Sequence, residues 1–268
     1  MNKTILVTGA TDGIGLQTAH LLARKGHDLL LHGRNPTKLD AVVATVSALP
    51  DAGAVERYVA DLSRLNTVVA MANDIAEKHD RIDVLINNAG VFKTRDPVTP
   101  QGLDVRFVVN TLAPYLLTQR LLVRMDAAGR VINLSSAAQS PVDTAAMNGQ
   151  RRLSDMDAYA QSKLALTMWS RHLADRLGDQ GPSIVAVNPG SLLATNMVKA
   201  AFGVAGNDIS IGADILVRAS LSDEFADASG KYYDNDAKRF APGHPDATDN
   251  GKCAEVVRVT EALLANAG

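Results

Sequence analysis

Short apolar runs alternate with longer segments of helical periodicity along almost the whole chain, and this alternation restricts the possible folds more than any other feature. The runs are nearly continuous in apolar residues, as in strands that are covered on both faces. Strands that alternate with helices indicate parallel pairing through right-handed crossovers. The expected strands are Thr4–Thr8, Asp28–His32, Val55–Ala60, Val84–Asn87, Arg130–Leu134, Ile184–Asn188 and a segment near Gly230–Tyr233.

No linker, internal repeat or low-complexity tract divides the 268 residues, so we expect one domain over residues 1–268. The predicted fold class is α/β, with a doubly wound, mostly parallel seven-stranded sheet and helices on both faces. Two segments, 137–157 and 191–210, fit neither pattern well. Both follow the carboxyl ends of strands, where open α/β sheets bind ligands, and we expect them to form substrate loops.

The composition excludes several classes of function. A net charge of −2 gives no reason to expect nucleic acid or an acidic membrane as a partner. The single cysteine, Cys253, excludes an intramolecular disulfide and fits a reducing compartment. No apolar run approaches the ~20 residues of a membrane helix, and Thr4–Thr8 has the pattern of a strand rather than a signal peptide. We expect a cytoplasmic protein without a metal site, because no Cys/His cluster is present.

The first strand is followed by a glycine-rich turn that runs directly into a helix. Its residues are Gly9, Ala10, Thr11, Asp12, Gly13, Ile14 and Gly15, with the spacing G-x3-G-x-G. Glycines allow a tight turn and let a pyrophosphate approach the backbone, while the helix N-terminus supplies N–H groups. Glycines also serve plain turns, but this position between the first strand and a helix favours a dinucleotide site.

The ends of the second and third strands indicate which dinucleotide is bound. The second strand ends before Arg34 and Asn35, without the carboxylate that an NAD site uses for the ribose 2′-hydroxyl. Arg34 suits a 2′-phosphate, although it is also consistent with a solvated arginine, and Asp12 argues against a nearby phosphate. We predict NADP, with NAD possible. Asp61, followed by Leu62, either accepts from the adenine amine or caps a helix.

Small residues and amides mark the ends of two further strands. The fourth strand ends in Asn87-Asn88-Ala89-Gly90, where a cofactor has room to cross the sheet edge. The sixth is followed by Pro189 and Gly190, with Thr195 shortly after. Each segment alone is an ordinary turn, so its assignment to the cofactor depends on the remaining motifs.

Tyr159 and Lys163 lie four residues apart on the expected helix Ala158–Leu177, so their side chains share one face. An ammonium group beside a phenol favours the phenolate and lowers a pKa that is ordinarily near ~10. The spacing alone is weak, because such pairs occur by chance. Ser135 and Ser136 add a hydroxyl at the carboxyl end of the fifth strand, close to the start of this helix.

Together these motifs resemble the short-chain dehydrogenase/reductase family over nearly the whole chain. The motifs are TGATDGIG, Asp61-Leu62, NNAG, Asn110, the Ser pair, YxxxK and Asn188-Pro189-Gly190. The resemblance implies a Rossmann fold, with Tyr159 as acid/base and Lys163 lowering its pKa while holding the nicotinamide ribose. It also implies that Ser136, with Ser135 as the alternative, binds the substrate oxygen. Asn87, Ala89, Gly90, Pro189, Gly190 and Thr195 would line the cofactor site.

The resemblance further implies that Asn110 holds a water beside Lys163, and Pro114 supports this on physical grounds. The carbonyl of a helical residue accepts from the N–H four residues later, and proline has none. The Asn110 carbonyl is therefore expected to lack its helical partner. A water there would complete a proton relay from Lys163 to solvent.

The length of the segment before Tyr159 points to one branch of the family. The 22 residues between Ser136 and Tyr159 form a longer segment than is common, which resembles the retinol-dehydrogenase-like and WW-domain-oxidoreductase-like branches. The expected function is NADP(H)-dependent hydride transfer with a small carbonyl or alcohol, an apolar ketone or aldehyde. The alternative is a non-catalytic NADP-binding sensor or scaffold. We also expect a homo-oligomer, a dimer or tetramer, with the helices Leu103–Arg124 and Ala158–Leu177 at the interface.

Overall fold

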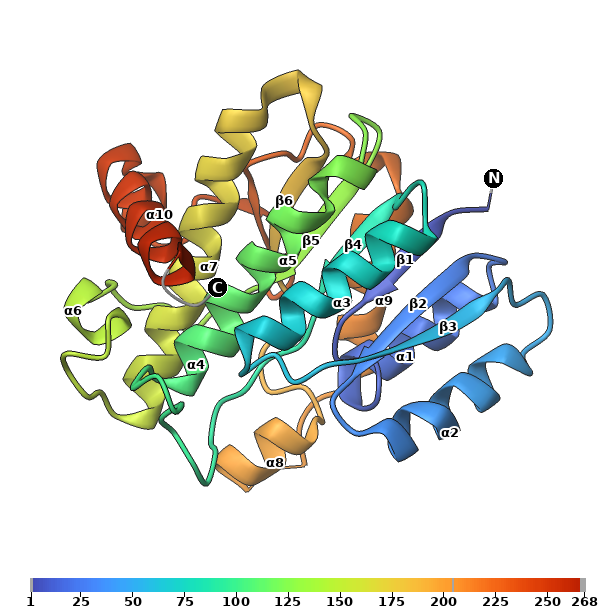
Figure 1. Ribbon diagram of the computed structural model, residues 1–268, viewed down its shortest axis with the longest axis horizontal. Helices are drawn as coiled ribbons and strands as arrows, with labels where there is room; N and C mark the ends of the chain where they lie inside the picture. The colour runs from blue at the N-terminus through green and yellow to red at the C-terminus, as the bar shows by residue number, and fades with distance from the viewer. Residues whose placement is uncertain (1, 204, 266–268) are drawn as a thin grey trace.

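The apolar runs pair as a single sheet in the order β3-β2-β1-β4-β5-β6-β7-β8 (Figure 1). The computed structural model describes residues 2–203 and 205–265, and in residues 200–202 the backbone alone. The strands are β1 Thr4–Val7, β2 Asp28–Gly33, β3 Val55–Val59, β4 Val84–Asn87, β5 Arg130–Leu134, β6 Ser183–Asn188, β7 Tyr232–Asp234 and β8 Arg239–Ala241. The seven expected strands are parallel, and the order reverses between β1 and β4, as in a doubly wound sheet.

The eighth strand is the one departure from the predicted sheet. β8 pairs antiparallel with β7 and lies in a tail that we expected to be a loop. Its three residues are too few to show a period-2 pattern, so only the pairing with β7 reveals it. Tyr232 and Tyr233 of β7 thereby gain neighbours on both sides.

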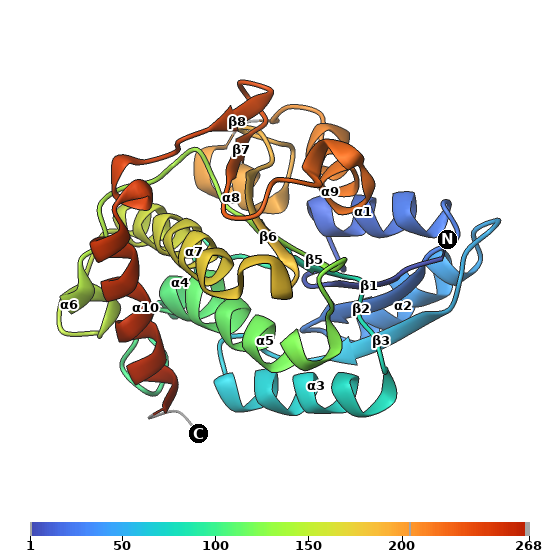
Figure 2. The same cartoon turned by 90° about the horizontal axis from the view of Figure 1, so that it is seen from above.

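Helices cover both faces of the sheet (Figure 2). Successive strand residues point to opposite faces, so Ile5 and Val7 pack into one core cluster and Leu6 into another. On one face lie α1 Gly13–Ala23, α2 Pro36–Ser47 and α9 Ser210–Leu221. On the other lie α3 Leu65–Lys78, α5 Ala113–Leu121 and α7 Asp155–Leu177, with α10 Asn250–Ala265 packed against α7.

The helical stretch predicted over Leu103–Arg124 contains a π-helical turn. It begins as α4 Val105–Phe107, continues as the π turn Val108–Leu112, and resumes as α5 before a final 3₁₀ turn at Leu122–Arg124. Ala113 N–H bonds to the Val108 carbonyl, five residues back, as in a π turn. Because Pro114 has no N–H, the regular ladder cannot continue through Asn110, which explains the wider turn.

The two segments predicted as loops carry short helices. α6 Thr144–Met147 lies within 137–157, and α8 Asn196–Phe202 within 191–210, of which residue 204 lies outside the described residues. The long helix α7 begins at Asp155, three residues before the expected Ala158. Ser154 is its N-cap, because the Ser154 hydroxyl accepts from Asp157 N–H.

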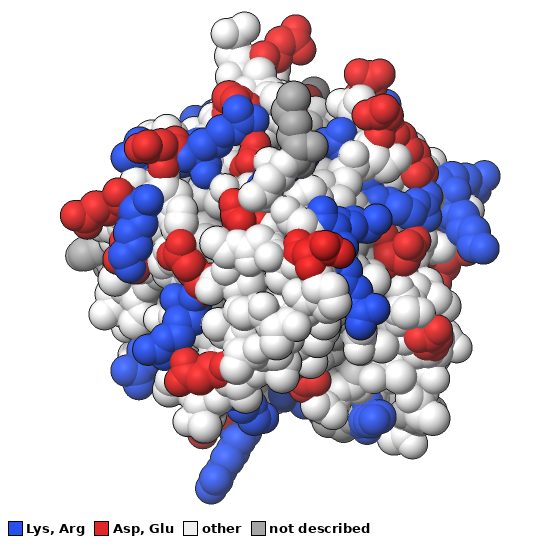
Figure 3. All heavy atoms as spheres, turned by 90° about the vertical axis from the view of Figure 1, so that its right-hand side faces the viewer, with Lys and Arg blue, Asp and Glu red and all other residues white. Residues whose placement is uncertain are grey.

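The open edge of the sheet at β3 is protected by charge. Glu56 and Arg57 are exposed on this strand, and Arg57 pairs with Asp40 of α2 at 3.0 Å. Figure 3 shows positive and negative side chains interspersed over this side of the molecule. Exposed charges on an edge strand disfavour pairing with another chain.

Candidate functional site

A cleft of about 560 Å³ runs along the carboxyl ends of the strands and brings most of the predicted site residues together. Those that line it are Gly9, Thr11, Asp12, Gly13, Ile14, Arg34, Asp61, Leu62, Ala89, Gly90, Ser136, Tyr159, Lys163, Pro189, Gly190 and Thr195. Gly15, Asn35, Asn87 and Asn110 do not line the cleft. The cleft has two parts, which we call the glycine-turn half (Gly9–Ile14 with Arg34 and Asp61) and the loop half (Phe92, Ala137, Met156, Leu192 and Met197).

The glycine turn is fixed by backbone geometry. Gly9 has φ +67° and Gly13 has φ +58°, a region that other residues rarely adopt. A Cβ on Gly15 would collide with the Gly9 backbone, so Gly15 serves the close packing of the turn. Asp12 is the N-cap of α1, with its carboxylate accepting from Gly13 N–H at 2.7 Å and from the Asn196 amide of α8.

His32 was not among the predicted site residues, and its side chain binds the backbone of the glycine turn. Its Nδ1 accepts from Gly9 N–H at 3.1 Å, and its Nε2 lies 3.1 Å from the Ala60 carbonyl. These contacts require the neutral ring with the proton on Nε2. Burial lowers the pKa of His32 to about 4, which keeps the ring neutral. The ring therefore joins the end of β2 to both neighbouring strand ends.

Arg34 projects at the rim of the glycine-turn half. It is exposed, and within the described residues it has no ion pair. Asn35 is directed elsewhere, since its side chain caps α2 by accepting from Lys38 N–H at 3.0 Å. Asp61 lines the cleft but also accepts from the N–H and hydroxyl of Ser63 at 3.0 and 2.7 Å, so it stabilises a turn without capping α3.

At the end of β4, Asn88 lines the cleft in place of the predicted Asn87. The Asn87 amide lies inside the protein, 2.8 Å from Asn133 Oδ1 and 3.2 Å from Thr118 Oγ1. Asn88 faces the cleft and donates to the Thr8 carbonyl at 2.8 Å. Adjacent residues at a strand end point to opposite sides, so only one of the two amides can reach the cleft.

Tyr159, Ser136 and Lys163 meet at the centre of the cleft. Ser136 is the side chain whose hydroxyl favours ionisation of the Tyr159 hydroxyl. Lys163 is 3% exposed, and its Nζ donates to the Leu134 carbonyl at 2.6 Å and lies 5.8 Å from the Tyr159 ring centre. Ser135 faces away from the cleft centre and bonds with Thr167 Oγ1 at 2.7 Å. Of the two serines, Ser136 is therefore the partner of Tyr159.

Burial dominates the titration of this cluster. Burial raises the pKa of Tyr159, and the hydrogen bond with Ser136 opposes the rise. Burial lowers the pKa of Lys163 to about 8. The expectation that Lys163 lowers the pKa of Tyr159 is not met in this structure, because the ammonium group is directed at the Leu134 carbonyl.

Asn110 connects the cluster to the loop half without entering the cleft. Its amide donates to Val91 O and Ser162 Oγ, both at 2.9 Å, and its Oδ1 accepts from Val91 N–H at 2.8 Å. A Cβ on Gly90 would lie 3.3 Å from Asn110 Oδ1 and 3.5 Å from Lys163 Nζ. The π turn therefore brings Asn110 close to Lys163.

The tail of the chain supports the site in a way that the sequence analysis missed. Tyr232 of β7 donates to the Ser136 carbonyl at 3.1 Å. Asp236, just beyond β7, accepts from the Ser191 N–H and hydroxyl at 2.9 and 2.6 Å and from the Asn188 amide at 2.9 Å. The β7–β8 hairpin thus holds both the Ser136 turn and the segment after β6.

Comparison with known proteins gives concordant matches. A family model described as short chain dehydrogenase matches residues 3–203. Retinol dehydrogenase 13 of Homo sapiens is 34% identical over 266 residues, which cover 92% of this chain and 80% of that protein. A metagenomic short-chain oxidoreductase solved in complex with NADP is 29% identical, with a TM-score of 0.62 over 83% of this chain and 92% of that chain. The promiscuous reductase LugOII, described as catalysing keto-reduction at C1 during lugdunomycin biosynthesis, is 29% identical with a TM-score of 0.66, over 87% and 95% of the two chains.

Proposed function

Because the chain belongs to the short-chain dehydrogenase/reductase family, in its retinol-dehydrogenase-like branch, we propose that it is an NADP(H)-dependent oxidoreductase that interconverts an apolar ketone or aldehyde and its alcohol. The observation that carries this proposal is the meeting of Tyr159, Ser136 and Lys163 at the centre of one cleft. Oxidoreductases of this type need a proton donor, a group that orients the substrate oxygen, and a dinucleotide site within reach, and the cleft has candidates for all three.

The cofactor assignment rests on the fit between the cleft and a phosphorylated dinucleotide. The glycine turn and the N-terminus of α1 suit a pyrophosphate, and Arg34, which forms no ion pair with any residue that the structure describes, suits a 2′-phosphate. No carboxylate lies at the end of β2, where His32 is neutral and turned inward. The nicotinamide of such a cofactor supplies or accepts the hydride. Solved relatives are described as NADP complexes, which supports the same choice.

Tyr159 is the proposed acid/base. In the reduction, its hydroxyl donates a proton to the substrate oxygen as negative charge develops there. Ser136 donates a second hydrogen bond to that oxygen and orients it. Lys163, protonated below about pH 8, is proposed to hold the nicotinamide ribose, because in this structure its ammonium group is directed at the Leu134 carbonyl and not at the Tyr159 hydroxyl.

Asn110 is the proposed support of a proton path from Lys163. The π turn and Pro114 alter the backbone hydrogen bonding around Asn110, while the Asn110 side chain is occupied by Val91 and Ser162. A water on the Asn110 carbonyl would link Lys163 to solvent. This path would restore the Tyr159 proton after each turnover.

The loop half favours an apolar substrate. Phe92, Ala137, Met156, Leu192 and Met197 present apolar side chains around the cluster. An apolar wall with few polar groups selects by shape and by the hydrophobic effect. Retinol dehydrogenase 13 and LugOII are named for alcohol and ketone chemistry, which agrees with this class.

The alternative is a protein that binds NADP without turnover, as a sensor or scaffold. The two possibilities separate when NADPH absorbance is followed with a panel of apolar ketones and aldehydes. We expect turnover by the wild type and a loss of about 10³-fold in kcat for Tyr159→Phe, the typical contribution of a positioned acid. Tyr58→Phe is the matched control, because Tyr58 bonds Glu56 and His79 far from the cleft. A wild type and a Tyr159→Phe variant that bind NADPH equally and are both inert would favour the sensor.

Location and assembly remain predictions. Within residues 2–203 and 205–265, no helix is long and apolar enough to cross a membrane. A cytoplasmic homo-oligomer, with α5 and α7 near the interface, stays the expectation from the sequence. Light scattering of the purified protein would measure the subunit number.

A further inference from the structure

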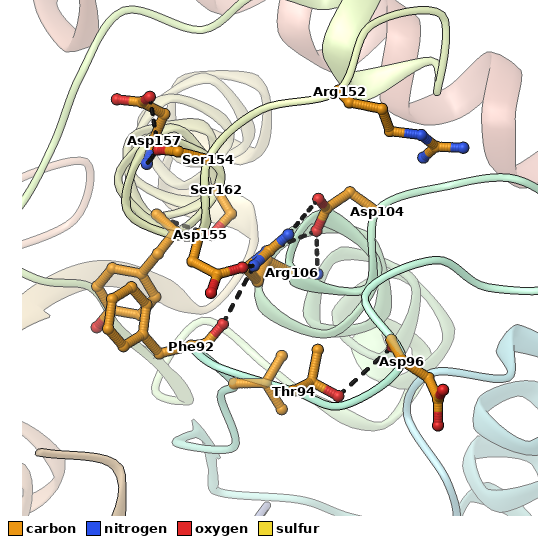
Figure 4. A network of polar contacts seen from close by, with 12 residues as sticks. Phe92, Thr94, Asp96, Asp104, Arg106, Arg152, Ser154, Asp155, Asp157 and Ser162 are labelled. Carbon is orange, nitrogen blue, oxygen red and sulfur yellow. Dashed lines mark hydrogen bonds and ion pairs between the residues drawn. The ribbon is translucent and has the colours of Figure 1, made fainter. Parts of the chain in front are cut away.

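Arg106 of α4 is a buried charge that contacts two segments beside the loop half, at Phe92 and at Asp155. It is 2% exposed and lies near the start of the helical stretch that contains Asn110. Its Nε and one terminal nitrogen bind the Asp104 carboxylate at 2.8 and 2.6 Å. The other terminal nitrogen donates to the Asp155 carboxylate and to the Phe92 carbonyl, the latter at 3.5 Å. Figure 4 shows the guanidinium between these partners.

The two outer partners are next to the proposed acid/base. Asp155 is the first residue of α7, one turn before Tyr159 on the same helix. The Phe92 ring packs edge-on against the Tyr159 ring, with centres 5.0 Å apart and planes at 68°. Phe92 and Met156, the neighbour of Asp155, both line the cleft. One side chain therefore joins the start of the Tyr159 helix to the backbone of the residue whose ring packs on Tyr159.

The geometry makes Arg106 a rigid anchor. Asp104 alone provides a bidentate carboxylate, so the buried charge is already paired without Asp155. The Asp155 side chain is 49% exposed, and an ordinary surface ion pair at such a site contributes little to stability. The contact with the buried guanidinium instead links the first residue of α7 to the Phe92 backbone. The contact with Asp155 is therefore expected to affect the position of α7 more than the stability of the fold.

We propose that Arg106 is a positioning residue for Tyr159, acting through Asp155 on the start of α7 and through Phe92 on the ring contact. Its catalytic consequence rests on the proposed function, whereas its structural consequence does not. Loss of the Asp155 contact releases the first turn of α7 and the Phe92 contact. Tyr159 then samples positions away from the substrate oxygen.

The direct test is ¹⁹F NMR of protein labelled with 3-fluorotyrosine, in which the chain has five tyrosines to resolve. The Tyr159→Phe variant assigns the Tyr159 resonance. In Asp155→Ala and Arg106→Lys this resonance should move or broaden, because the Phe92 ring beside it shifts. The matched control is Asp157→Ala, since Asp157 lies in the same first turn of α7 but pairs with Ser154 and not with Arg106. In this control the resonance should keep its wild-type position.

Steady-state kinetics provide the second measurement. Asp155→Ala should lower kcat about tenfold, because small misplacements of a reacting group cost 10-fold to 100-fold in rate. The Kd for NADPH should not change, because Arg106, Asp104 and Asp155 do not line the cleft. Asp157→Ala should stay within about twofold of wild type in kcat, as expected for a surface change.

The outcomes separate the two proposals. Equal ¹⁹F spectra and equal kcat for Asp155→Ala and wild type would overturn the role of Arg106. Equal changes in Asp155→Ala and Asp157→Ala would overturn it too, because the effect would then belong to any weakening of the helix start. If the wild type turns over no carbonyl at all, the proposed function fails, while the ¹⁹F comparison still decides whether Arg106 positions Tyr159. Asp155 is half exposed, so its variant is expected to fold even if Arg106→Lys does not.

Discussion

The glycine-turn half of the cleft is assembled from strand ends, whereas the loop half is assembled from contacts between distant parts of the chain. In the first, Gly9, Arg34 and Asp61 each lie within two residues of the end of a strand. In the second, Arg106 donates to the Phe92 carbonyl and to the carboxylate of Asp155, the neighbour of Met156, and Leu192 lies in a segment tied to the β7–β8 hairpin. The first half is therefore as rigid as the sheet, and the second depends on a few side-chain bonds.

This difference agrees with the chemistry expected of each half. A dinucleotide presents the same phosphates in every member of a family, so a fixed backbone cradle suits it. Substrates vary, and loops on a rigid scaffold can change without disturbing the sheet. The reactive cluster of Tyr159, Ser136 and Lys163 also lines the cleft and is bonded to β5 through Leu134 and to β7 through Tyr232.

The largest expected effect concerns the rigidity of the glycine-turn half. His32 has a pKa of about 4 when folded and about 6.5 when unfolded, so the unfolded chain takes up the proton first as the pH falls. The folded state therefore loses stability between about pH 6.5 and pH 4, by about 3 kcal/mol in all. We therefore measure the free energy of unfolding by denaturant at several pH values. Over this range it should depend less steeply on pH in His32→Asn than in the wild type.

His27 provides the control for this measurement. It precedes β2, and its pKa is also lowered by burial, but its Nδ1 accepts from Lys3 N–H, away from the cleft. His27→Asn should remove a smaller part of the acid sensitivity and leave the Kd for NADPH unchanged. If His27→Asn and His32→Asn flatten the slope equally, His32 has no special part in holding the turn.

The same contrast explains which features the sequence predicted. The strand positions, the glycine turn and the Tyr159–Lys163 pair depend on local spacing, so they were visible in the sequence. The inward turn of Asn87 depends on which of two adjacent amides faces the cleft, and the sequence does not distinguish them. The contact between Arg106 and Asp155 joins residues 49 positions apart, and no local pattern marks it. The three-residue β8 was missed for the same reason.

A second prediction concerns selectivity at the rim of the glycine-turn half. Arg34→Ala should raise the Kd for NADPH about 10-fold to 100-fold, because hydrogen bonds to a charged group contribute about 1.5–3 kcal/mol. The Kd for NADH should stay nearly constant, since NADH has no 2′-phosphate. Fluorescence titration of both cofactors measures the ratio.

Arg57→Ala is the matched control for Arg34→Ala. Arg57 is an exposed arginine on the neighbouring strand β3 that pairs with Asp40 and does not line the cleft. The Arg57→Ala substitution should leave the Kd for NADPH and the Kd for NADH unchanged. Equal losses of NADPH and NADH affinity in Arg34→Ala would mean that Arg34 does not read the 2′-phosphate, and the preference for NADP over NAD would lose its structural support.

The smallest expected effect tests a side-chain contact between the glycine turn and the 191–210 segment. The Asn196 amide at the start of α8 donates to the Asp12 carboxylate of the glycine turn, so the contact holds the 191–210 segment against the cofactor cradle. Asp12→Ser keeps a residue suited to the N-cap of α1 but is too short to reach Asn196. Asn196→Ala removes the other partner.

A double-mutant cycle on the NADPH dissociation rate should give a coupling of about 1 kcal/mol, or about fivefold in rate. The cycle cancels the change in charge that Asp12→Ser introduces beside the phosphates. Additive effects of the two substitutions would mean that the contact between Asp12 and Asn196 does not retain the cofactor.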